Sequence, residues 1–154
     1  MIPSEPFNGI IYVRSGEFKN LTLDTTDAGI FGYTGSTAVI DGITINNCHF
    51  TGTVAGAIVA HNNGLVSNYT VLNSTVSATK SAGGVVGENN GTIIAFNQSQ
   101  KSLNAVPKKG EVNETVVSSD IYAGGIAGMN GSLGIISAET DYATYVSEIG
   151  RAHV

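Results

Sequence analysis

The pair of residues best suited to acid–base chemistry in this sequence is His61 with Glu88. They stand at the same position in two consecutive copies of a repeated phrase, and Tyr33 and Met129 hold that position in the copies on either side. If consecutive copies stack as neighbouring strands, the two side chains lie about 5 Å apart. A histidine beside a carboxylate can transfer protons, but on a surface the same pair is an ordinary contact between strands. We predict the second, an exposed contact between neighbouring repeats.

Carboxylates offer the other route to catalysis. Asp24, Asp27 and Asp41 form the densest acidic group, and glycoside hydrolysis needs two carboxylates roughly 5–10 Å apart. The position of Asp27 is not acidic in later repeats, where it continues as Ala55, Ala82 and Ala123. The position of Asp24 is acidic again only at Asp120, three repeats away, at about 14 Å. We therefore predict that the three aspartates are turn and edge residues and that the chain has no catalytic residues.

The cysteine and the histidines do not form a metal-binding pattern. A metal site needs three or four converging ligands with a recognisable spacing, and the sequence offers only Cys48, His49 and His61, with His153 near its end. We therefore predict no metal and no cofactor. As the single cysteine, Cys48 cannot form an internal disulfide, and its strand-like surroundings indicate a small buried residue.

The elements that would position these residues come from a phrase repeated along the chain. It occurs at 55–64, 82–91 and 123–131, and a weaker copy occupies 28–35. Gly56 and Gly83 lie 27 residues apart, whereas Gly83 and Gly124 lie 41 apart. The longer interval is a 27-residue repeat with about 14 additional residues, which we place in a charged Pro/Gly loop at about 104–114. Such spacing indicates stacked structural repeats.

Aligned positions of the phrase predict what each repeat contributes. One position is aliphatic in every copy, and the residues two before and two after it are small. Since residues two apart share a strand face, each repeat presents a face that reads small, large, small. A second position is Thr34 in the first copy and asparagine in the others, at a turn where stacked amides can hydrogen-bond to one another. The structural positions of the repeat are Gly56, Ile58, Asn62, Gly83, Gly84, Val85, Gly87, Asn89, Gly91, Gly124, Gly125, Ile126, Gly128 and Asn130.

Together these features predict an all-β fold, a parallel β-helix (β-solenoid) with coils of about 27 residues. The usual twist of strands favours a right-handed coil, and no stretch shows the periodicity of a helical repeat. We expect a partial N-terminal coil or cap at 1–26 and coils near 27–53, 54–79, 80–120 and 121–147. Residues 148–154 match the translation of a common sequencing adapter, and we expect them to be an artefact outside the natural fold.

The composition suits an extracellular scaffold. Only 12% of the residues are charged and the net charge is −5, against roughly 25% charged residues in ordinary domains. No basic patch is available to bind nucleic acid, and no apolar run is long enough to span a membrane. The first residues lack the basic and apolar segments of a signal peptide. We expect an extracellular or cell-surface protein whose signal peptide is not part of this sequence.

The stretch at 82–93, Ala-Gly-Gly-Val-Val-Gly-Glu-Asn-Asn-Gly-Thr-Ile, resembles the GLUG-motif repeat of bacterial secreted and cell-surface proteins. The resemblance extends over roughly residues 7–137, and the chain departs from the motif where Ala57 and Ala60 replace glycines. It implies a β-helical region of a large adhesin-like or protease-associated surface protein. It supplies no catalytic residues.

We therefore predict a non-enzymatic structural repeat segment, an adhesin-like stalk or display scaffold. Its expected partners are further repeats or domains of a full-length protein, and host or glycan ligands. The alternative is part of a carbohydrate-active β-helix enzyme, a polysaccharide lyase or glycosidase, or a protease-associated region. In that case the catalytic residues would lie outside this segment.

Overall fold

The chain folds entirely into strands and connecting turns, with no helix among the residues described. The computed structural model describes residues 5–95, 110–137, 144–148 and 151–152, with side chains up to residue 137. The strands form four sheets, and strands within a sheet pair in parallel. The predicted all-β, parallel character is confirmed, and the arrangement is compatible with a β-helix.

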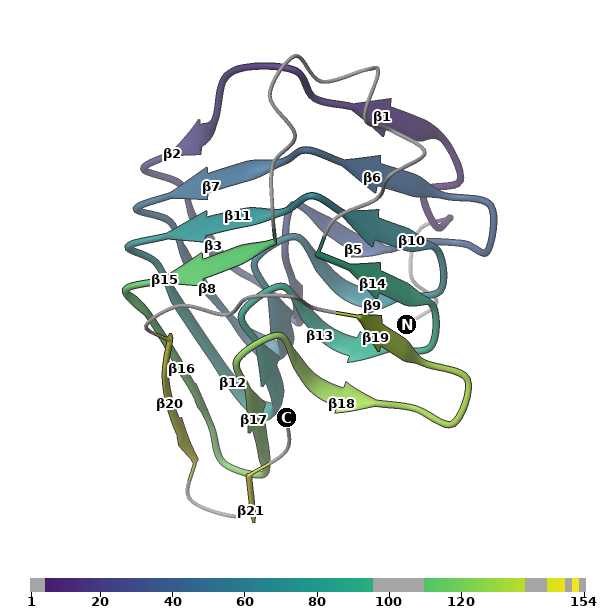
Figure 1. The fold of residues 1–154 in the computed structure, drawn as a ribbon. Coiled ribbons are helices and arrows are strands. Elements are labelled where there is room, and N and C mark those ends of the chain that lie inside the picture. The colour runs from purple at the N-terminus through teal and green to yellow at the C-terminus, as the bar shows by residue number, and fades with distance from the viewer. Residues whose placement is uncertain (1–4, 96–109, 138–143, 149–150, 153–154) are drawn as a thin grey trace.

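Each sheet collects equivalent strands from successive stretches of the chain. The first sheet contains β1 (Ile10–Tyr12), β6 (Val39–Asp41), β10 (Leu65–Ser67), β14 (Thr92–Ile94) and β19 (Ile135–Ser137). The second contains β2 (Phe18–Lys19), β7 (Thr44–Asn46), β11 (Thr70–Leu72) and β15 (Glu111–Asn113). Figure 1 shows both sets stacked side by side, one strand below the next.

The third sheet is the largest. It contains β3 (Thr22–Asp24), β4 (Asp27–Ala28), β8 (His49–Gly56), β12 (Thr75–Gly83), β16 (Thr115–Ser119), β17 (Tyr122–Gly124), β20 (Thr144–Glu148) and β21 (Arg151–Ala152). The fourth contains β5 (Phe31–Tyr33), β9 (Val59–Asn62), β13 (Val86–Asn89) and β18 (Ala127–Asn130). We call one passage of the chain through the four sheets a circuit: β1–β5, β6–β9, β10–β13 and β14–β18 are the first to fourth circuits.

Strand register explains the uneven spacing of the repeats. Ser67 pairs with Ile94, and Thr70 pairs with Glu111. In the third circuit Thr70 comes three positions after Ser67, whereas in the fourth circuit Glu111 comes seventeen positions after Ile94. The fourth circuit therefore has fourteen additional residues between these two strands. Part of the loop expected at about 104–114 is wrong, because residues 111–113 form β15, and residues 104–109 of it lie outside the described residues.

The core consists of inward columns of β-branched and aromatic residues. One column is Ile40, Val66 and Ile93, the next is Ile45, Val71 and Val112, and the third is Phe50, Val76 and Val117. All are at most 1% exposed. Since each fully buried side chain of this size contributes about 1.5–3 kcal/mol, and its neighbours in the column come from adjacent circuits, the circuits stabilise one another.

The repeated phrase forms a corner rather than the single strand that we predicted. Gly56 ends β8, residues 57–58 bend, and Val59 begins β9. The aliphatic residues at this bend fill the inside of the corner, with Ile58 and Val85 at 0% exposure and Ile126 at 7%. A Cβ on Gly56 would lie against the Val59 carbonyl oxygen and 2.5 Å from the Gly87 nitrogen. The glycines therefore allow backbone contact where the chain passes from the third sheet to the fourth.

Both ends of the sequence contribute strands. Residues 10–24, within the expected N-terminal cap, form β1–β3 and pair in register with β6–β8. At the other end, β20 and β21 extend the third sheet and include residues 148 and 151–152 of the suspected adapter translation. Among the described residues, no helix has the length and apolar character needed to cross a membrane.

Candidate functional site

A cluster of charged and aromatic side chains lies where the third and fourth sheets meet. Two rows of stacked residues build it. In the fourth sheet Tyr33, His61 and Glu88 are register partners on β5, β9 and β13. In the third sheet Asp27 and Ser81 both pair with Val54 of β8. We call Asp27, Tyr33, His61, Lys80, Ser81 and Glu88 the His61 cluster.

The imidazole of His61 bridges two carboxylates. Its Nε2 lies 2.8 Å from Asp27 Oδ1, and its Nδ1 lies 3.4 Å from Glu88 Oε1. The Tyr33 ring stacks on the imidazole, with ring centroids 4.3 Å apart and planes 6° from parallel. The predicted contact between His61 and Glu88 is confirmed, but the pair is not fully exposed, since these side chains are only 20% and 19% accessible. The sequence prediction missed Asp27 as a partner.

Every carboxylate oxygen in the cluster has a partner. Tyr33 Oη donates to Asp27 Oδ2 at 3.3 Å. On the other carboxylate, Glu88 Oε2 lies 3.1 Å from Lys80 Nζ and accepts a hydrogen bond from Ser81 Oγ at 3.2 Å. The cluster therefore links the first, second and third circuits through a continuous chain of polar contacts.

These contacts shift the proton affinities of the cluster. Burial alone would lower the pKa of His61, but hydrogen bonds to Glu88 and Asp27, with their negative charges, outweigh it and raise that pKa. For Glu88, the hydrogen bond from His61, together with Lys80, overcomes the effect of burial and lowers the pKa to about 2. Burial and then the charge of Asp27 raise the pKa of the Tyr33 hydroxyl.

The geometry of the cluster does not suit metal binding. Nε2 of His61 already faces the Asp27 carboxylate and Nδ1 faces that of Glu88, so the two carboxylates approach different atoms of the ring. They therefore cannot converge with the imidazole on one metal ion. More generally, the described part of the chain contains no group of three or more His, Cys, Asp or Glu side chains placed to hold a metal.

Comparison with known proteins identifies no family and no relative of this chain. Neither the protein-family models, the curated proteins nor the solved structures give a match to this chain.

The three aspartates singled out in the sequence have three different environments. Asp24 is exposed, as expected of an edge residue. The expectation was wrong for Asp41, which is completely buried and accepts hydrogen bonds from Ser67 Oγ and Asn68 Nδ2, both at 2.6 Å. It was incomplete for Asp27, which belongs to the His61 cluster. Because Ser67 and Asn68 belong to the next circuit, stacking supplies the donors that make burial of Asp41 tolerable.

The predicted asparagine ladder is present. Thr34 Oγ1 donates to Asn62 Oδ1 at 2.6 Å, and Asn62 Nδ2 donates to Asn89 Oδ1 at 2.8 Å. Asn89 Nδ2 then donates to Asn130 Oδ1 at 2.8 Å. The ladder also closes the turns, since Asn89 exchanges hydrogen bonds with the backbone of Gly91, as Asn62 does with Gly64.

A second asparagine column was not predicted. Asn20, Asn47 and Asn73 have positive φ angles of 60°, 53° and 50°, and Asn47 Nδ2 donates to Asn20 Oδ1 at 2.7 Å. Asparagine tolerates this left-handed conformation better than most residues. The signal was available in the sequence, because these residues are spaced by 27 and 26 positions.

The cysteine and the other described histidine do not join the cluster. Cys48 is completely buried, in agreement with its predicted role as a small core residue. His49 is exposed, and its Nδ1 lies 2.6 Å from Thr75 Oγ1. The structure therefore does not assemble Cys48, His49 and His61 into one site.

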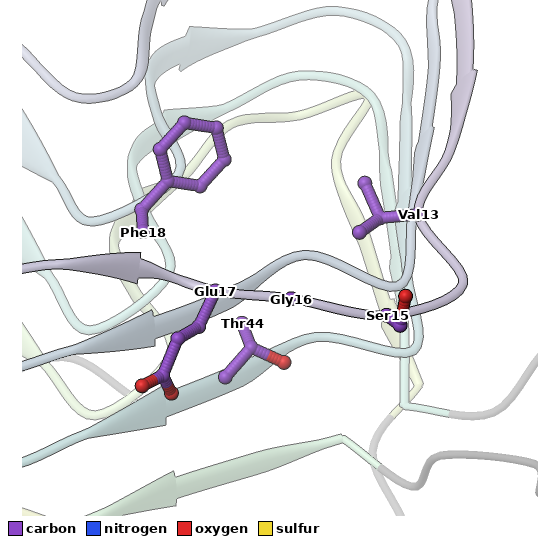
Figure 2. Close-up of a pocket in the computed structure, with 6 residues that line it drawn as sticks. All are labelled: Val13, Ser15, Gly16, Glu17, Phe18 and Thr44. Atoms are coloured by element: carbon purple, nitrogen blue, oxygen red, sulfur yellow. The ribbon is translucent and has the colours of Figure 1, made fainter.

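Two pockets lie outside the cluster. One, of about 300 Å³, is lined by Val13, Ser15, Gly16, Glu17 and Phe18 of the first circuit and by Thr44 of the second; Figure 2 shows Val13 and Phe18 on opposite sides of it. The other, of about 430 Å³, is lined by Asp24, Thr25, Thr26, Thr51, Gly52, Thr53 and Thr79. Hydroxyls and one carboxylate can hydrogen-bond to a polar ligand such as a glycan.

Proposed function

We propose that this chain is a non-enzymatic structural repeat segment, a right-handed parallel β-helix (β-solenoid) that serves as an adhesin-like stalk or display scaffold of a bacterial secreted or surface protein. The observation that carries the proposal is the register of the circuits. Leu65 pairs with both Val39 and Thr92, so three successive circuits place equivalent residues side by side. The resemblance of residues 82–93 to GLUG-motif repeats supports the same function.

Such a scaffold should accept an additional circuit. Residues 65–91 span one complete circuit, because Leu65 is the register partner of Thr92. We expect that inserting a second copy of 65–91 after Gly91 gives a folded protein at least as stable as the parent, since the new strands pair with both neighbours. Circular dichroism and the urea midpoint of unfolding would measure this.

The control insertion duplicates only 65–77, about half a circuit, and would place each following strand in the wrong sheet. It should destabilise or unfold the chain. If the full-circuit insertion is no better tolerated than the half-circuit insertion, the circuits are not interchangeable units and the solenoid proposal fails.

A scaffold that displays or contacts glycans should bind without turnover. The purified chain would be screened on immobilised glycans and incubated with soluble polysaccharides, and new reducing ends and unsaturated uronates would be measured. We expect no product. The pocket beside Asp24 is the candidate glycan contact, so Asp24→Asn should weaken any binding found, whereas Asp120→Asn, an exposed aspartate outside that pocket, should not.

Product release would favour the carbohydrate-active alternative and overturn the non-enzymatic proposal. Glu88→Gln would then show whether the His61 cluster performs the reaction, because this change removes the carboxylate charge and keeps the side-chain shape.

A further inference from the structure

The His61 cluster has a protonation requirement that follows from its geometry. A protonated imidazole has two N–H donors, and here each ring nitrogen faces a carboxylate. A neutral imidazole has one donor and one acceptor. On deprotonation, one nitrogen lone pair would therefore face a carboxylate oxygen, and one of the two contacts would be lost.

We propose that the Asp27–His61–Glu88 contacts form a pH-dependent link that holds the first three circuits together most strongly in mildly acidic surroundings and weakens as the pH rises. The link crosses circuit boundaries twice, because Asp27 belongs to the first circuit, His61 to the second and Glu88 to the third. A weaker link therefore makes the stacking of these three circuits less stable.

Each neighbouring strand contributes a defined group to this environment. Asp27 comes from β4, the Tyr33 hydroxyl from β5, Lys80 from β12 and Glu88 from β13. The strand β8 contributes the uncharged Val54 as register partner of Asp27. Lys80 contacts the Glu88 oxygen that His61 does not use. The Lys80–Glu88 pair can thus persist when His61 loses its proton.

The direction of the pH dependence follows from the shifted pKa values of His61 and Glu88. The pKa of His61 is raised above 6.5 in the folded chain, so its stabilisation is complete below pH 6.5 and is lost as the pH rises through the folded-state value. The pKa of Glu88 falls from 4.5 to about 2, so its stabilisation is present above pH 4.5 and is lost towards pH 2. The link is therefore strongest between these limits, at about pH 4.5–6.5.

The test compares the urea midpoint of unfolding at pH 5.5 and pH 8.0 for the full chain, His61→Asn and His49→Asn. We expect the midpoint of the full chain to fall at pH 8.0. His49→Asn should show the same fall, because His49 is exposed and its imidazole contacts the Thr75 hydroxyl and no group of the His61 cluster. His61→Asn should have a lower midpoint at pH 5.5 and little or no fall. A full fall in His61→Asn, or none in the full chain, would overturn the proposal.

An NMR titration of the imidazole signals keeps the proposal testable even if His61→Asn does not fold. We expect the His61 signal to titrate with a midpoint above 6.5, and Glu88→Gln to move that midpoint down. For each unit by which the His61 midpoint exceeds 6.5, the folding equilibrium constant is expected to be tenfold larger in acid than in alkali. A His61 midpoint at or below 6.5, or one unmoved by Glu88→Gln, would contradict the proposed link.

Discussion

Ile58→Asp is expected to unfold the central circuits of the chain. Ile58 is completely buried at the corner between β8 and β9, inside the hydrophobic core. The substitution removes about 1.5–3 kcal/mol of apolar burial and places a carboxylate where nothing polar compensates it, at a cost of several kcal/mol more. That sum approaches the total stability of about 5–15 kcal/mol that single domains possess.

The measurement is the loss of cooperative thermal or urea unfolding followed by circular dichroism. Ile121→Asp is the matched control, since the same chemical change falls on a side chain that is 45% exposed at the end of the third sheet's β16–β17 turn. We expect the control to stay within about 0.5–1 kcal/mol of the parent chain. Equal effects of the two substitutions would show that the corner is not part of the core.

Asn89→Ala is expected to cost about 1 kcal/mol or more of the free energy of unfolding. Asn89 is completely buried and stands in the middle of the asparagine ladder. Without its side chain, Asn130 loses a donor, Asn62 Nδ2 loses an acceptor, and the Gly91 N–H loses its bond to Asn89 Oδ1. A buried group left without a partner costs about 1–3 kcal/mol; the loss here is at the lower end, because Asn62 still donates to Gly64 and Asn130 is exposed to water.

The neighbouring residue provides the control for this substitution. Asn90 is exposed, so Asn90→Ala should change the urea midpoint little. Comparable losses for the two alanine variants would mean that stacking of the amides contributes no more than a surface turn residue does.

Several features of the fold could be predicted because equivalent residues recur at the period of the stack. The aliphatic positions at 58, 85 and 126 are buried, and the asparagines at 62, 89 and 130 hydrogen-bond to one another. In a stack of parallel strands, residues one period apart become neighbours about 4.8 Å apart. Sequence alignment of the repeats therefore predicts contacts within a sheet, including that of His61 with Glu88, although it was wrong at Asp27, which pairs with Val54 and not with the aligned Ala55.

Contacts between sheets follow a different rule, and the prediction failed there. Asp27 and His61 are 34 positions apart and belong to different rows, so no repeat alignment pairs them. They meet because the chain bends at residues 57–58 and brings the third sheet beside the fourth. Asp41 was misplaced for another reason: its register partner Ser67 lies in the same sheet, but its second donor, Asn68, lies beyond the end of β10 in a left-handed conformation with φ of 52°.

By itself, then, the sequence determined the parallel stacking, the buried aliphatic position of the repeated phrase and the main asparagine ladder, because these depend only on period and residue type. Only the tertiary structure decided that Asp27, His61 and Glu88 form one link across three circuits and that Asp41 is buried. For the link, the physical reason is that the angle between two sheets depends on the backbone at the corner, where glycines permit close contact, and the spacing of repeats does not encode this angle.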